Sequence, residues 1–179
     1  MKLRHVLSVF MLIVLPVTVS ADMGIGNGNY RLSTKGAKWW VQFPVSDYEL
    51  QNKRISIDGK SFYYMFSNKI NGLNVSFFIE EANMCTNSEA CRDMFWSNPG
   101  PMVVNPQYVK KYNLNNFAIV EYCLINLKFQ GQNLDQMNIS GHIVKGGYWI
   151  DMHISKVQLK DTDISLFHNF IDSISFQQR

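Results

Sequence analysis

The sequence predicts an α+β fold in which an antiparallel β-sheet packs against helices. Three observations lead to this fold class. Strand-like segments follow one another through most of the chain, with short turns between them, so neighbouring strands are expected to pair antiparallel. Only two segments carry apolar residues at helical spacing, one in the middle of the chain and one at its end. Helices do not alternate with strands along the chain, as a parallel sheet would require.

The first 21 residues have the organisation of a secretory signal peptide. Lys2 and Arg4 precede an apolar run over 6–19, and Val19 and Ala21 stand at −3 and −1 of a cleavage site. The run has about 14 residues, fewer than the roughly 20 that a membrane-spanning helix needs. We therefore expect an exported protein, periplasmic or extracellular, with no transmembrane segment after cleavage.

The exported chain has the size of one domain. Residues 22–36 are rich in Gly, Asn and Ser and predict a flexible N-terminus, and residues 37–179 predict a single α+β domain. Removal of Lys2 and Arg4 leaves 15 basic and 14 acidic residues, a formal charge of +1. This balance argues against the basic surface to which nucleic acids bind.

The first half of the domain is predicted to form strands and then a helix. A strand over 39–43 ends at a proline, and a hairpin over 55–67 turns at Asp58-Gly59. A further strand covers 73–80. Helical spacing then begins at Ser88, the expected cap, and the Asn-Pro-Gly-Pro sequence over 98–101 is expected to end the helix.

The second half is predicted to form three strands and a closing helix. The stretch 102–116 fits either strand or loop, and 117–129 is strand-like. After a polar turn, 137–145 and 148–157 flank Gly146-Gly147, a strong hairpin signal. From 161 onward a helix is expected, with one apolar stripe formed by Ile164, Phe167, Phe170, Ile171 and Ile174.

The three cysteines predict one disulfide. Cys85 and Cys91 flank five residues, and an oxidising compartment would allow them to pair and to fasten the end of a strand to the first turn of a helix. The alternative is that all three thiols stay reduced, with Cys123 packed as a small apolar residue. Their spacing fits no zinc-binding pattern.

The two ends of the domain carry the sequences WVQFP over 40–44 and SISF over 173–176, the second after a hairpin and a helix containing Phe167 and Ile171. In these segments and in the order of its elements the chain resembles the PsbP-like family, α/β sandwiches named for an extrinsic photosystem subunit. The resemblance implies a sandwich fold. It also implies a non-catalytic binding or assembly role, because most members of the family have one, and it assigns no site residue.

The hairpin around Gly146-Gly147 gathers the most polar side chains. A two-residue turn places His142 opposite Asp151, and alternation then puts both on one face with His153, while Ile143 and Ile150 enter the core. Three hypotheses follow. His142, Asp151 and His153 bind zinc or copper; or Asp151 orients His142 as a base for a serine, Ser140 or Ser155; or the cluster is structural. We favour the structural interpretation and expect no cofactor.

Adjacent aromatic residues on strands predict a second occupied face, because neighbours such as Tyr63 and Tyr64 must point to opposite sides. Either helices cover the second set of rings, or the rings form an exposed binding surface. The candidates for such a surface are Trp39, Trp40, Tyr148 and Trp149.

The preferred function is that of an exported, non-enzymatic protein that binds another protein or a component of the cell envelope. Export, near-neutral charge and the aromatic residues on strands support it. The alternative is an exported metal-dependent or hydrolytic enzyme that uses His142, Asp151 and His153.

Overall fold

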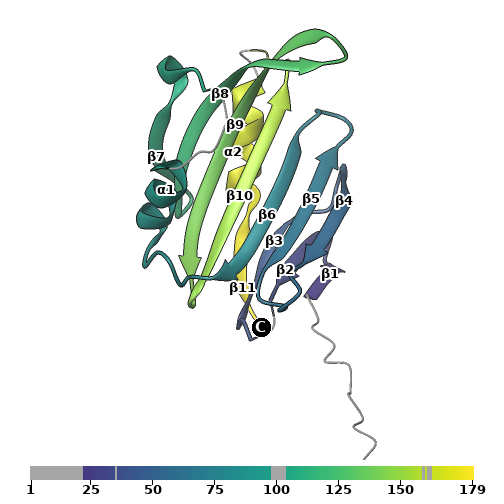
Figure 1. Ribbon diagram of the computed structural model, residues 1–179. Coiled ribbons are helices and arrows are strands. Elements are labelled where there is room, and N and C mark those ends of the chain that lie inside the picture. Colours follow the sequence, from purple (N-terminus) through teal and green to yellow (C-terminus); the bar gives the residue numbers. More distant parts are fainter. Residues whose placement is uncertain (1–21, 35, 98–103, 159, 161–162) are drawn as a thin grey trace, which may run out of the picture.

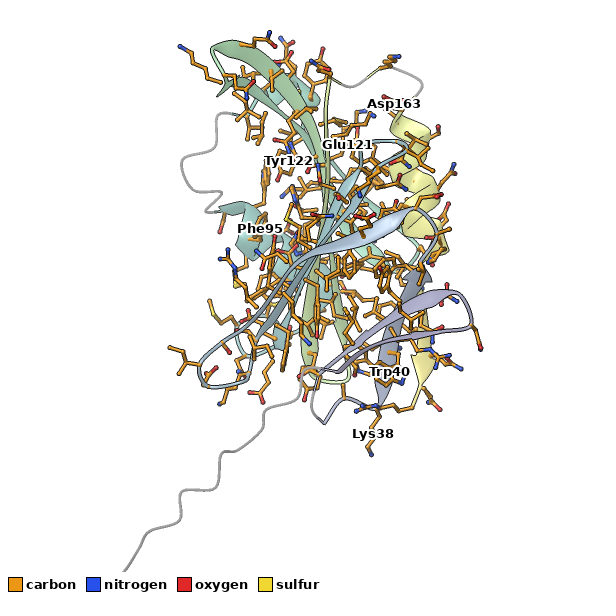
Figure 2. The ribbon with its side chains drawn as sticks, turned by 90° about the vertical axis from the view of Figure 1, so that its right-hand side faces the viewer. Lys38, Trp40, Phe95, Glu121, Tyr122 and Asp163 are labelled. Carbon is orange, nitrogen blue, oxygen red and sulfur yellow. A yellow bond between two sulfur atoms is a disulfide. The ribbon has the colours of Figure 1, made fainter. Side chains whose placement is uncertain are left out.

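The computed structural model describes residues 22–34, 36–97, 104–158, 160 and 163–179. The predicted signal peptide, the predicted helix stop at 98–101 and the predicted helix start at 161–162 lie outside the described residues. Two antiparallel sheets pack face to face (Figure 1). The larger sheet has a helix on each side, and Figure 2 places Phe95 of the first helix and Asp163, at the start of the second, on opposite sides of it.

The smaller sheet contains four strands in the order β1-β2-β3-β11. Its strands are β1 (Asp22–Gly26), β2 (Asn29–Ser33), β3 (Trp39–Pro44) and β11 (Ser175–Gln178). The segment 22–36, which we predicted to be a flexible N-terminus, therefore supplies two paired strands. Asn27 and Gly28 join them with φ values of 52° and 72°, and positive φ at both central residues is what a type I′ turn requires.

The larger sheet contains seven strands in the order β4-β5-β6-β10-β9-β8-β7. Its strands are β4 (Tyr48–Ile55), β5 (Phe62–Asn68), β6 (Asn74–Glu81), β7 (Lys110–Leu114), β8 (Phe117–Phe129), β9 (Gln132–Lys145) and β10 (Tyr148–Val157). The predicted register of the β9–β10 hairpin is confirmed, since Asp151 pairs with His142 and Ile150 with Ile143. The uncertain stretch 102–116 contributes the edge strand β7, preceded by a short 3-10 helix over Pro106–Tyr108.

Both predicted helices are present, as α1 (Ser88–Ser97) and α2 (Ile164–Ser173). Asn87, rather than the expected Ser88, caps α1, because its side-chain oxygen accepts a hydrogen bond of 2.8 Å from the Ala90 amide. The predicted disulfide between Cys85 and Cys91 is confirmed, with Cα atoms 5.1 Å apart, and it fastens the chain to the first turn of α1.

No helix of the described residues has both the length and the apolar character needed to cross a membrane.

The core between the sheets centres on Phe43 of β3. Its ring lies 5.0–5.6 Å, centroid to centroid, from four other aromatic rings, contributed by β2, β5, β6 and α2. These partners are Tyr30, Phe66, Phe77 and Phe170. One residue thus joins the smaller sheet, the larger sheet and α2. Four of the five residues of the predicted apolar stripe are buried in this core, namely Phe167, Phe170, Ile171 and Ile174, whereas Ile164 is partly exposed.

The predicted α+β class, an antiparallel sheet packed against helices, is wrong. Strands make up 57% of the described residues and helices 17%, and the larger sheet packs mainly against a second sheet, as in a β-sandwich. The second sheet escapes a local analysis because two of its strands are short and lie in the segment 22–36, which is rich in Gly, Asn and Ser. Its fourth strand, β11, pairs with β3 from the other end of the chain.

The position of Phe43 makes it the most sensitive test of this core. Phe43→Ala is expected to lower the free energy of unfolding by about 3–5 kcal/mol, because it removes a buried ring from the junction of three elements. Urea unfolding followed by tryptophan fluorescence measures the loss. Ile25→Ala, at an exposed position of β1, is the control and should change stability by no more than about 0.5 kcal/mol. Equal effects of the two substitutions would contradict this description of the core.

Candidate functional site

The larger sheet has an inner face, which packs on the smaller sheet and α2, and an outer face, part of which α1 covers over β8 and β9. Adjacent residues of β8 show the division in Figure 2, where Tyr122 points toward α1 and Glu121 toward α2. On the outer face, His142 and Asp151 lie in one row across the strands, and Ser140 and His153 lie in the next. The predicted polar residues therefore share a face.

His142 is fully buried beneath α1, with the Phe95 ring centroid 5.2 Å from its own. The indole Nε1 of Trp149 donates a hydrogen bond of 3.2 Å to its Nδ1. Because Nδ1 accepts, a neutral imidazole carries its proton on Nε2. The Nε2 atom is buried without a hydrogen-bond partner, so His142 is bonded to neither Ser140 nor Ser155.

Asp151 approaches His142, with 3.6 Å between its Oδ1 and the His142 Nδ1. Burial, together with the positive charge of Arg92, lowers the pKa of His142 to about 4. Burial also raises the pKa of Asp151 to about 7, helped by the nearby Glu80. Between about pH 4 and pH 7 the shared region therefore holds a protonated carboxyl beside a neutral imidazole, an uncharged pair suited to a covered position.

His153 takes a different partner. Its Nε2 lies 3.0 Å from the Asn138 Oδ1, an acceptor, so Nε2 carries the proton, and burial lowers the pKa of this imidazole to about 4. Within the described part of the chain, no group of three or more His, Cys, Asp and Glu side chains is placed to hold a metal ion. The three predicted ligands thus share a face without converging on a common point.

Two of the four residues predicted for an aromatic binding surface are buried, and the other two are half-buried. Trp39 is 4% exposed between the sheets, and Trp149 is 8% exposed against α1. Tyr148 lies edge-on to Trp39, and the Arg179 guanidinium covers the ring of Trp40 at 4.4 Å. Adjacent aromatic pairs in the sequence predict these four residues, but such pairs cannot reveal what packs on each face of a strand. Side chains elsewhere in the sheet do alternate between its two faces.

The part of the outer face that α1 does not reach forms a groove over β4, β5, β6 and β10. We call it the outer groove. It consists of two adjoining hollows of about 570 and 170 Å³, which share Tyr63 and Met65. The remaining lining residues are Asn52, Arg54, Ile55, Ser56, Ser61, Asn74, Val75, Ser76, Phe78, His153 and Ser155. Most of them carry a hydroxyl, amide, imidazole or guanidinium group.

Strand register places Arg54, Tyr63, Phe78 and Asp151 in one row across four strands. Tyr63 and Phe78 are half-buried neighbours on β5 and β6, while Tyr64 is fully buried in the core. Strand alternation predicted that Tyr63 and Tyr64 point to opposite faces of the sheet, but no sequence pattern singled out Phe78 or Arg54. Alternation along 73–80 puts Phe78 and Phe77 on opposite faces of the strand. Only the pairing of β5 with β6 places the Phe78 ring beside the Tyr63 ring.

A second hollow of about 490 Å³ opens on the inner face, near the start of α2. Glu121 is buried there and accepts hydrogen bonds from Lys110 at 3.0 Å and from the Tyr112 hydroxyl at 2.9 Å. The same hydroxyl lies 3.1 Å from the His168 Nε2. Cys123, which forms no disulfide, also lines this hollow, and burial raises the pKa of its thiol. The Glu121 carboxylate thus has a partner for each oxygen.

The chain matches no known protein-family model, and no curated protein is significantly similar to it in sequence. The resemblance to the PsbP-like family therefore stays a prediction.

The raised pKa of Asp151 gives a testable pH dependence. Between about pH 4 and pH 7 the folded protein binds a proton at Asp151 that the unfolded chain has released, so the contribution of this residue to stability falls as pH rises. Asp151→Asn removes that fall. The variant should therefore gain stability relative to the wild type between pH 5 and pH 8, on the order of 2 kcal/mol.

Urea unfolding at pH 5 and pH 8 measures this difference. Asp172→Asn, at an exposed position of α2, is the control, and its effect on stability should be small and the same at the two pH values. The two lowered histidine pKa values act in the opposite direction, since they make stability rise with pH between about 4 and 6.5, but they are common to both proteins. A pH-independent effect of Asp151→Asn would contradict the assignment.

Proposed function

We propose that this is an exported, non-enzymatic binding protein that attaches to a component of the cell envelope through the outer groove. The observation that carries the proposal is the groove itself, an open hollow lined by two aromatic rings and several hydrogen-bonding side chains from neighbouring strands. Binding sites for small molecules and chains combine apolar contact with a few directed polar groups in this way.

The positions of the two imidazoles support binding rather than catalysis. His142 is covered by α1 and its Nδ1 is occupied by Trp149, so it is not available to a substrate in the groove. His153 does line the groove, but its Nε2 is held by Asn138. An acid–base mechanism needs a group within hydrogen-bond reach of the substrate and a pKa near the working pH, and neither imidazole meets both conditions.

The disulfide supports the exported location. Bonds such as Cys85–Cys91 form and persist in oxidising compartments and are rare in the cytosol. The predicted signal peptide agrees with this compartment, and the PsbP-like resemblance agrees with a binding role.

Co-sedimentation with the washed envelope fraction of the encoding organism tests the proposal. The wild-type protein should sediment with the envelope, and the double variant Tyr63→Ala/Phe78→Ala should lose at least about tenfold in affinity because it removes both rings. Tyr108→Ala is the matched control, since Tyr108 is exposed but lies outside the groove, and it should bind like the wild type.

Circular dichroism establishes that each variant is folded. A wild-type protein that stays in the supernatant, or a folded double variant that binds as well as the wild type, would refute the proposal.

A further inference from the structure

We propose that the outer groove binds an oligosaccharide, whose rings stack on Tyr63 and Phe78 and whose hydroxyl groups bond to the polar side chains around them. This inference rests on the proposed function and names the chemistry of its ligand. The side chains that line the groove, their charges and the length of the groove support it.

The groove lies over the face of the sheet and offers side chains to a ligand. Strands β5, β6 and β10 each have a hydrogen-bonded neighbour on both sides, so their backbone groups are already paired. The fourth strand, β4, is an edge strand, but its free edge lies in the plane of the sheet, on the side away from β5, and not over the groove. A peptide that binds as an added strand needs an unpaired sheet edge. Recognition on this face therefore depends on side chains alone, and the ligand must carry its own donors and acceptors along its length.

The two rings provide the apolar part of the site. Tyr63 and Phe78 are directly paired across β5 and β6, so their side chains stand next to each other on the face, and Met65 lies in the adjoining row. A pyranose ring has one face made of C–H groups, and such a face packs against an aromatic ring, which is a large apolar surface. Two neighbouring rings fit consecutive sugar units better than a single one.

Neutral hydrogen-bonding groups surround these rings. Asn52 and Ser76 lie on either side of Met65 in its row, and His153 follows Ser76 on β10. Amide and hydroxyl groups both donate and accept, as the hydroxyl groups of a sugar do, and the Nδ1 of the His153 imidazole accepts. Burial lowers the pKa of His153, which keeps its imidazole neutral at physiological pH.

The charges argue against the main alternatives. Arg54 is the only basic residue that lines the described groove, whereas a nucleic acid requires several basic residues along its backbone. The polar lining is equally unsuited to a purely apolar partner. Arg54 stands at the β4 end of the row, where its guanidinium is placed to bond a carboxylate of an acidic sugar.

The groove also sets a length. The row of lining residues from Asn52 through Met65 and Ser76 to His153 crosses three strand spacings, about 14 Å. A single sugar covers only part of this distance, so we expect a short chain to bind more tightly than a monosaccharide.

Two soluble probes test the inference: the tetramer of N-acetylglucosamine, which is neutral, and tetragalacturonate, which carries carboxylates. Titration of the ¹⁵N-labelled protein, followed by NMR, gives the dissociation constant and the backbone amides that shift. Binding of at least one probe is expected, with shifts on β4, β5, β6 and β10. The corresponding monosaccharide should bind at least about fivefold more weakly.

Variants assign the contacts. Tyr63→Ala and Phe78→Ala should each weaken binding at least about tenfold, whereas Tyr63→Phe, which keeps the ring, and the control Tyr108→Ala should leave it within about twofold. Arg54→Gln should weaken tetragalacturonate roughly tenfold or more and leave the neutral tetramer unchanged. An equal effect on both probes would remove the role of Arg54.

The outcomes separate the two proposals. If neither saccharide binds, or if binding survives folded Tyr63→Ala and Phe78→Ala, the inference is overturned. Envelope binding that still depends on the two rings would then leave the proposed function standing with a ligand of another class, such as a protein. If envelope binding is also absent, both proposals fail.

Discussion

The packing of aromatic rings around Phe43 is the interaction on which the arrangement of this protein depends. Phe43 belongs to the smaller sheet, but its neighbours Phe66 and Phe77 belong to the larger sheet and Phe170 belongs to α2. Large flat rings at these spacings bury much apolar surface and hold their neighbours in defined orientations. The inner face of the larger sheet is thereby occupied along the strands that meet the smaller sheet, and any ligand surface on these strands must use the opposite face.

The outer face is divided between two environments, and the division follows from α1. Under the helix, His142 loses contact with water, and the protein accommodates it by keeping its imidazole neutral and by pairing the ring with the Trp149 indole. The neighbouring Asp151 carboxyl has its pKa raised to about 7. Beyond the helix, the same face stays open in the outer groove, which polar side chains line. Residues on the same face of the sheet therefore differ in their exposure to solvent, because α1 covers only part of that face.

Local patterns predicted much of the larger sheet. The Gly146-Gly147 turn and the alternation of side chains were sufficient for the register of β9 with β10, including the pairing of His142 with Asp151. The helical stripe of α2 and the Cys85–Cys91 disulfide could also be predicted from the sequence, because each depends on residues close in sequence. The second sheet could not be predicted, since β11 pairs with β3 across most of the chain, and such long-range pairing leaves no local pattern. The candidate site was lost for the same reason: Tyr63 and Phe78 become neighbours only through the pairing of β5 with β6.

The inner hollow has a consequence for the integrity of the covalent structure. Disulfides rearrange when a thiolate attacks one of their sulfur atoms, so the rate depends on how much of the third cysteine is ionised. Cys123 is partly buried beside Asp135, and burial together with this negative charge raises the pKa of its thiol. It also lies on β8, with its side chain in the inner hollow, whereas Cys85 and Cys91 pack with Trp149 on the outer side. The sheet thus separates the free thiol from the disulfide of the same chain, which hinders exchange between them.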